Sequence, residues 1–425
     1  MAKLSKNQKC LFSIHLLRGI MELFTNTFLT SHIITSITSD NVLGAGLFNS
    51  AIFYISQYVF YAVVYVLASF FVKRYNRAIF LQLSIFVNLG LIIGLVFWGD
   101  AISGWIVLVG ALCGLSNALY YAAYFVMKNE LAHRRTMKHY NILTVIGVNI
   151  IKIVMPTILG FLIDASTYSY IAIYMIFIAV AQFVISFFIT TSKAVYSKLQ
   201  LSKYLKELRQ DPEAKSKIKY TYINAIFSGI KNTYKLIVIV LTVYTLKTNL
   251  GLGIFTSITS VVVLGMLIGF KFLDNKKNVN KFSIYFIIGI LPLITCFGIV
   301  FYLEQITLII FNFFLNVAIY FSDYFGSSER DAIIKHIGKR EYIAEHQLLI
   351  EIITCISRVA AYGVMLLVGF LENIDIFKVL LVVFMILSFV KYMVMYKQRQ
   401  IRKDYEIKNK ESLNENNDDE KKPAV

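Results

Sequence analysis

The stretch Leu43-Gly-Ala-Gly-Leu-Phe-Asn-Ser50 returns later in the chain as Leu250-Gly-Leu-Gly-Ile-Phe-Thr-Ser257, with five identities in eight positions. Two further echoes keep the same order along the chain. Gly160-Phe-Leu162 recurs as Gly369-Phe-Leu371, and Ala118, Tyr120, Tyr124 and Phe125 recur as Ala318, Tyr320, Tyr324 and Phe325. The offsets of 207, 200 and 209 residues differ only as variable connections require. The sequence therefore predicts two related halves.

The composition places both halves in a membrane. Of the 425 residues, 57% are hydrophobic and only 16% are charged, whereas a soluble chain of this length needs more charged surface. The apolar residues form runs of about 20 or more, the length of a helix that crosses about 30 Å of hydrocarbon. We predict an all-α protein with twelve membrane helices over residues 10–37, 45–71, 78–98, 104–127, 140–163, 169–191, 221–246, 250–272, 282–303, 305–326, 344–370 and 375–396.

The positive charge alternates along the chain. The net charge of +17 comes mostly from every second connection between apolar segments, whereas the opposite set contains only Lys247. This distribution argues against nucleic-acid binding. By the positive-inside rule we expect both termini and the connector 192–220 in the cytoplasm, with the chain in the plasma membrane.

The chain divides into four expected parts. Residues 1–191 form an N-terminal six-helix half, 192–220 a basic cytoplasmic connector, 221–396 a C-terminal six-helix half, and 397–425 a disordered tail rich in Lys, Glu, Asn and Asp. Within the connector, residues 194–210 are amphipathic and basic, which predicts either a surface helix on anionic headgroups or a solvated linker.

Two six-helix halves in parallel repeat, joined by a basic connector, resemble the major facilitator superfamily of secondary transporters. The family has a loop motif, roughly Gly-x-x-x-Asp-Arg-x-Gly-Arg-Lys, after its second helix. Here Ser69-Phe-Phe-Val-Lys-Arg74-Tyr-Asn-Arg77-Ala keeps two arginines but has Lys73 in place of the Asp. The resemblance implies two bundles around a central cavity, with the third, sixth, ninth and twelfth helices facing lipid.

Charged residues inside the apolar segments follow that division. They are Arg18, Glu22, Lys152, Lys231, Lys235, Glu351 and Arg358, and all belong to segments that the resemblance places around the cavity. A charge at mid-membrane costs free energy unless it faces a partner or water. The third, sixth, ninth and twelfth segments are expected to carry none in their cores.

These charges predict a net-basic site. Arg18 and Glu22 are one helical turn apart and can pair, and Lys231 and Lys235 share a face that suits a phosphate or carboxylate. We predict substrate binding by Arg18, Lys152, Lys231, Lys235 and Arg358. The alternative, that Arg18–Glu22 is a helix-internal pair and that Lys152 or Arg358 bridges the halves, stays open.

Polar and aromatic residues at helical spacing complete the candidate site. Asn117, Tyr120, Tyr124 and Tyr320 are predicted to contact an organic solute, although ordinary packing explains each tyrosine about as well among 27 in the chain. Glu22 and Glu351 are candidate proton-coupling residues, because burial disfavours a charged carboxylate.

We therefore expect a monomeric secondary carrier of a small anionic or zwitterionic solute, with protons as a candidate second substrate. Alternatives are an exporter of drugs, amphiphiles or lipid-linked substrates, or a sensor that binds without transport. No enzyme is expected, since His133, His139 and His336 stand among basic residues without an acid motif. No cofactor or metal site is expected, and no ATP-binding loop motif occurs.

The fifth apolar segment gives two opposing indications about the direction of transport. Met155-Pro156-Thr-Ile-Leu-Gly160 keeps the proline and one glycine of the Gly-Pro-x-x-Gly-Gly motif of drug antiporters, which favours export. Lys152, one turn earlier, is unsuited to a site for cationic drugs.

Overall fold

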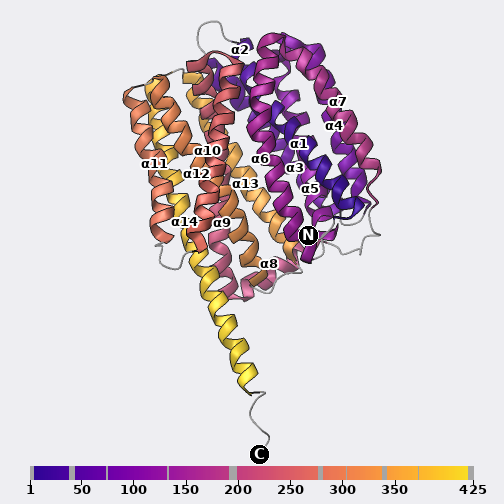
Figure 1. Cartoon of the computed structure of the whole chain (residues 1–425), viewed down its shortest axis with the longest axis vertical. Helices are drawn as coiled ribbons and strands as arrows, with labels where there is room; N and C mark the ends of the chain where they lie inside the picture. The colour runs from indigo at the N-terminus through magenta and orange to yellow at the C-terminus, as the bar shows by residue number, and fades with distance from the viewer. Residues whose placement is uncertain are drawn as a thin grey trace, which may run out of the picture.

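The computed structural model describes residues 4–37, 44–72, 75–131, 134–190, 199–275, 281–302, 304–336, 342–371 and 373–419. Within these ranges the regular structure is helical, without strands. Long helices run side by side in one bundle, and both termini lie at the same end (Figure 1). We call the opposite end of the bundle the distal end.

The N-terminal half follows the predicted segments. Its first segment is broken into α1 (Lys6–Leu23), a π-helical turn η1 (Phe24–Phe28) and α2 (Leu29–Ile37). The others are α3 (Gly44–Val72), α4 (Arg77–Trp98), η2 (Gly99–Trp105), α5 (Ile106–Leu131), α6 (Arg134–Ala165) and α7 (Tyr168–Phe187).

The C-terminal half repeats this order. It begins after α8 (Leu201–Gln210) and consists of α9 (Pro212–Leu246), α10 (Asn249–Asn275), α11 (Lys281–Phe301), α12 (Gln305–His336), α13 (Ile343–Leu371) and α14 (Ile374–Asp419). Eleven of the described helices are long and apolar enough to cross a membrane. The remaining predicted segment is the broken path α1–η1–α2. The predicted all-α membrane architecture is confirmed.

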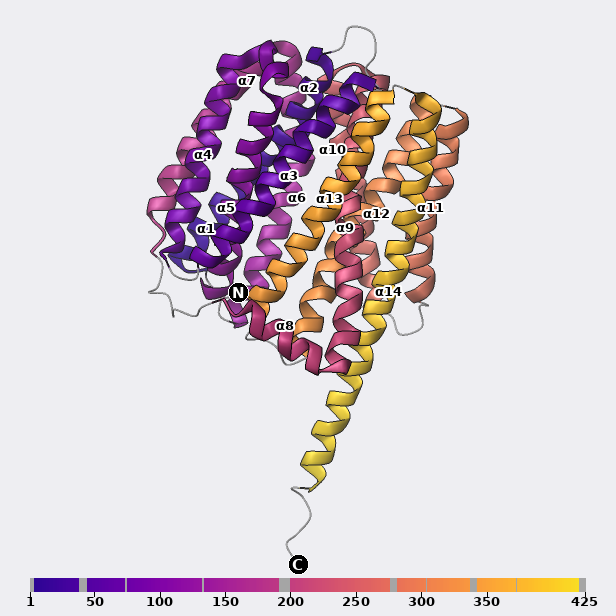
Figure 2. The ribbon, with the colours of Figure 1, turned by 180° about the vertical axis from the view of Figure 1, so that it is seen from behind.

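Helices at the two flanks of the bundle carry the lipid-compatible surface. Large apolar side chains such as Phe86 and Phe97 on α4, Phe177 on α7 and Phe297 on α11 are exposed, as hydrocarbon contact allows. These helices lie at the outside in both views (Figure 2). One departure is Lys391 on α14, which is buried in a segment expected to carry no charge in its core. It stands five residues before the predicted end of that segment.

The connector contains the expected amphipathic helix, α8, but its apolar face is covered by protein. Tyr204 and Leu208 are buried in a cluster with Ile218 of α9 and Tyr342. The Tyr204 hydroxyl lies 3.1 Å from His346 Nδ1 on α13. An amphipathic sequence shows only that one face of a helix is shielded from water. In α8 that face packs against the C-terminal half rather than against headgroups.

The tail also differs from expectation, because α14 continues as a helix to Asp419 beyond residue 396. Its first part is anchored: Gln398 is buried and accepts a hydrogen bond from Asn224 Nδ2 at 2.9 Å. The rest extends away from the bundle (Figure 2). Lys- and Glu-rich sequence has good helix propensity, so a helix nucleated in the bundle can run on without packing.

The repeated glycine motifs meet each other across the two halves. A Cβ added to Gly160 of α6 would lie 2.4 Å from the carbonyl oxygen of Asn249 on α10, and one added to Gly253 of α10 would lie 2.3 Å from that of Pro156. In the related pair, a Cβ on Gly369 of α13 would lie 2.6 Å from the Phe48 amide nitrogen of α3. The start of the second helix in each half therefore crosses the end of the fifth helix in the other half.

This close crossing makes a stability prediction. Gly253→Ala forces its methyl group against the Pro156 carbonyl and should lower the free energy of unfolding by about 1–3 kcal/mol. Gly265→Ala is the matched control on the same helix, because nothing lies within 4 Å of its added Cβ. The thermal unfolding midpoint of each purified variant in detergent measures the difference. Equal midpoints for the two variants would contradict the crossing.

Candidate functional site

A cavity of about 570 Å³ lies between the two halves. Its wall is formed by α1, η1, α3, α5 and α6 from the N-terminal half and by α9, α10, α12 and α13 from the C-terminal half. Among its described lining residues none belongs to α4, α7, α11 or α14. The four helices absent from the lining are thus the ones that the family resemblance placed toward lipid.

Seven of the predicted site residues line this cavity. They are Glu22, Asn117, Lys152, Lys235, Tyr320, Glu351 and Arg358. Four others, Arg18, Tyr120, Tyr124 and Lys231, are buried and do not belong to its lining. Of the two lysines predicted to share one face of the cavity, Lys235 lines it and Lys231 does not. Positions one turn apart on a helix differ by about 40° in direction, enough to separate a wall residue from a packed one.

Arg18 lies outside the cavity lining and contacts Glu22, which lines the cavity. Its Nε lies 3.3 Å from Glu22 Oε1, and its Nη1 donates to the Ser116 hydroxyl at 3.0 Å. Its Nη2 donates to Asn117 Oδ1, and the guanidinium stands over the Tyr120 ring, 5.1 Å from the ring centroid. These contacts of Arg18 are all within the N-terminal half, so Arg18 acts as a positioning residue for Glu22.

The Glu22 carboxylate faces the cavity with a second donor in place. Tyr121 of α5 donates its hydroxyl to Glu22 at 2.8 Å from Oε1 and 3.0 Å from Oε2. Glu22 is one-quarter exposed while Arg18 is only 3% exposed. A solute or proton therefore reaches the carboxylate but not the guanidinium.

His15 was not among the site residues predicted from the sequence. His15 lines the cavity, stacks on Tyr124 with ring centroids 4.4 Å apart, and has its Nδ1 2.9 Å from the Tyr120 hydroxyl. The buried tyrosines predicted to bind solute thus support His15 instead. Its spacing of three and seven residues before Arg18 and Glu22 puts all three on one helical face, a signal that could have found it.

In the C-terminal half the charges of α13 face α3. Glu351 accepts hydrogen bonds from Gln347 Nε2 at 3.0 Å and from the Tyr61 hydroxyl at 3.4 Å. Arg358 lies over the Tyr58 ring, 4.7 Å from its centroid. With its amide oriented to match these donors, Asn232 accepts from Arg358 Nε at 2.5 Å and Nη2 at 3.2 Å. Arg358 therefore bridges the halves, one of the two roles left open for it.

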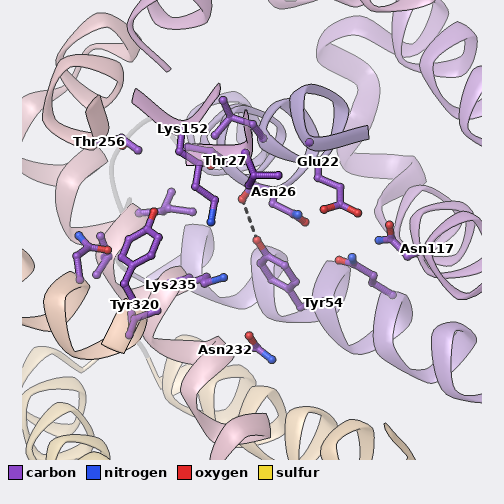
Figure 3. A pocket seen from close by; sticks show the side chains of 18 of the residues that line it. Glu22, Asn26, Thr27, Tyr54, Asn117, Lys152, Asn232, Lys235, Thr256 and Tyr320 are labelled. Carbon is purple, nitrogen blue, oxygen red and sulfur yellow. Dashed lines mark hydrogen bonds between the residues drawn. The ribbon is translucent and has the colours of Figure 1, made fainter. Parts of the chain in front are cut away.

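Lys152 and Lys235 present their ammonium groups to the cavity from opposite halves. Lys152 of α6 stands over the Tyr320 ring, 4.8 Å from its centroid, and Lys235 of α9 has an exposed side chain. Figure 3 shows both side chains reaching into the space between Tyr320 and Tyr54. This is the basic part of the cavity.

Polar residues that sequence reasoning did not select surround the two lysines. Asn26 and Thr27 stand on the π-helical turn η1, a feature common at functional sites. Tyr54 donates to the carbonyl oxygen of Asn26 at 3.1 Å (Figure 3). Thr256 of α10 faces them across the cavity. The run Thr25-Asn26-Thr27 within an apolar segment was the available signal.

Other predictions concern residues at the edge of what the structure describes. The residues Lys73 and Arg74 and the side chains of His133, His139 and His336 lie outside the described part of the chain. Among the described residues no group of three or more metal-ligating side chains occurs.

A sequence model described as Major Facilitator Superfamily matches residues 11–333. Among curated proteins no match was found. The fold is similar to that of a peptide transporter solved with sulfate, with a TM-score of 0.68 and 10% identity over 94% of this chain and 95% of that one. It is also similar to a POT family transporter in complex with 5-aminolevulinic acid, with a TM-score of 0.64 and 12% identity over 94% and 96%. A D-xylose–proton symporter gives a TM-score of 0.65 with 12% identity over 92% and 97%.

The Arg18–Glu22 contact predicts strong coupling between two substitutions. Arg18→Met alone leaves the Glu22 carboxylate without its guanidinium and should lower the free energy of unfolding by about 3–5 kcal/mol. Arg18→Met combined with Glu22→Gln should recover about 1–3 kcal/mol of that loss. A double-mutant cycle of detergent-solubilised unfolding measures the coupling. Additive effects of the two substitutions would show that the pair is not formed.

Proposed function

This chain belongs to the major facilitator superfamily of secondary transporters, and we propose that its substrate is a small organic anion or zwitterion bound between Lys152 and Lys235. The observation that carries the proposal is the placement of these two ammonium groups, one from each half, in the same part of the cavity (Figure 3). An anionic group there lowers the cost of keeping both charges away from bulk water.

Among the described residues, three other charged side chains line the cavity, and each contacts side chains of the protein. Glu22 is held by Arg18 and Tyr121, and Glu351 by Gln347 and Tyr61. Arg358 is held by Asn232 and the Tyr58 ring. The lysine region is the part of the cavity where positive charges from both halves lie, which suits an anionic group of a solute.

The position of the lysines also supports a transport cycle. Lys152 moves with the N-terminal half and Lys235 with the C-terminal half, so an anion that contacts both links the halves around the site. In this family the halves are expected to rock about such a central site, which exposes it to each side of the membrane in turn. The amide and hydroxyl groups of Asn26, Thr27 and Thr256 then supply hydrogen bonds that select among anions.

Replacing both lysines tests the anion site. The protein is reconstituted into liposomes, and counterflow of a panel of labelled organic anions and zwitterions is measured. Lys152→Gln together with Lys235→Gln should reduce counterflow of the active solute at least about tenfold, the effect of losing roughly 1.4 kcal/mol of binding. Lys247→Gln is a control at a lysine outside the cavity. Unchanged counterflow in the double variant would refute the site. Binding without counterflow in the wild type would favour a sensor.

We further propose that Glu22 and Glu351 couple transport to protons. Both carboxylates line the cavity, and each accepts from a tyrosine hydroxyl that can stay bonded whether the carboxyl group is charged or neutral.

Glutamine at both positions separates coupling from binding. Glu22→Gln with Glu351→Gln should abolish accumulation driven by a pH gradient while leaving counterflow at equal pH within about threefold of wild type, since glutamine keeps the shape and the hydrogen-bond acceptor. Glu304→Gln, an exposed carboxylate at the distal end, is the control. If the double variant still accumulates solute in response to the pH gradient, these carboxylates are not the coupling groups.

A further inference from the structure

At the distal end a carboxylate of the N-terminal half binds the first turn of a helix of the C-terminal half. Asp164 stands in the last turn of α6, and α10 begins at Asn249. Asp164 Oδ2 accepts from the Leu250 amide at 2.7 Å. Its Oδ1 accepts from the Asn249 amide at 3.2 Å and from Asn249 Nδ2 at 2.9 Å. One carboxylate thus holds three donors of the opposite half.

A second helix of the N-terminal half reaches the same residue. Ser31 of α2 donates its hydroxyl to Asn249 Oδ1 at 3.1 Å, so both polar atoms of the Asn249 amide are bound by the N-terminal half. One turn before Asp164, Gly160 lets the α6 backbone approach the Asn249 carbonyl. Further along the same crossing, the hydroxyls of Thr157 and Ser257 lie 2.8 Å apart.

The geometry of α10 prepares it for this contact. Lys247 ends α9 in the left-handed conformation, with φ of 56°, and α10 starts two residues later. The first N–H groups of a helix have no partner within the helix, and the helix dipole favours a negative charge there. Asp164 supplies that charge from the other half. If the halves separate at this end, the Asn249 and Leu250 amides lose this acceptor, whereas the Gly251 amide keeps the Thr248 hydroxyl of its own half at 3.0 Å.

We propose that Asp164 and the first turn of α10 form a clasp that sets the balance between the form seen here, in which the halves touch at the distal end, and a form in which they separate there. Asp164 is exposed at the surface, so water replaces it readily when the clasp opens. The contact therefore biases the equilibrium without locking it. The proposal requires that the halves separate at the distal end, but it is independent of which solute is carried.

Distances between spin labels test the clasp without any substrate. Nitroxides are placed at Ser103 in the N-terminal half and Glu304 in the C-terminal half, both exposed at the distal end, with the four native cysteines replaced by serine. Distance distributions are measured by double electron–electron resonance in nanodiscs. Asp164→Ala should add or enlarge a long-distance component and raise the open-to-closed ratio roughly two- to thirtyfold, the range expected for loss of a helix cap.

A matched control removes a cap that stays within one half. Asn373 accepts hydrogen bonds from the Asp375 and Ile376 amides in the first turn of α14, so Asn373→Ala should leave the distance distribution unchanged. Asp164→Asn, which keeps the shape but not the charge, should give a smaller shift than alanine. The proposal is overturned if Asp164→Ala and wild type give the same distribution, or if Asn373→Ala opens the distal end equally. Size-exclusion profiles establish that each variant is folded.

Discussion

The cost of a charge in hydrocarbon organises this molecule. A charged side chain at mid-membrane must meet a partner, a ring face or water, and each described charge that lines the cavity does so. Glu22 meets Arg18 and Tyr121, while Arg358 meets Asn232 and the face of Tyr58. Because the flanking helices expose large apolar side chains instead, most of these charges lie in or beside one cavity, with Lys391 of α14 as the departure. The position of the site is thus a consequence of the hydrocarbon that surrounds the bundle.

A second constraint concerns how the two halves contact each other. The touching surfaces are two pseudo-equivalent helix crossings, α3 with α13 and α6 with α10, and glycines at Gly369, Gly160 and Gly253 bring the backbones together there. Close backbone contact supplies van der Waals attraction with little side-chain interlocking. Such a surface can hold the halves in register and still allow one to tilt on the other. Polar contacts at its distal edge, around Asn249, then adjust how readily it opens.

Much of this could be predicted from the sequence because membrane and repeat leave strong signals. The spans follow from runs of apolar residues, and nearly every predicted span matches a described helix within a few residues, apart from helices that extend beyond the membrane. The choice of cavity helices followed from the family resemblance, and charges such as Arg18, Lys152 and Glu351 agreed with it. By contrast, the partner of an amphipathic face could not be predicted. Tyr204 and Leu208 of α8 pack against protein, whereas contact with lipid headgroups was one of the two expectations. Periodicity identifies a buried face but not what buries it.

The sequence by itself determined the membrane location, the two-fold repeat and the set of charges available to a site, because these depend on residue types and their spacing. Only the tertiary structure decided what each charge does. Lys231 and Lys235 are one turn apart, yet only Lys235 lines the cavity. Arg18 positions Glu22. His15 and Asn26 line the cavity, although they were not predicted from the sequence. Likewise, nothing around Asp164 in sequence indicated the first turn of α10, 85 residues away. Contacts between helices depend on rotation and crossing geometry, which local sequence does not encode.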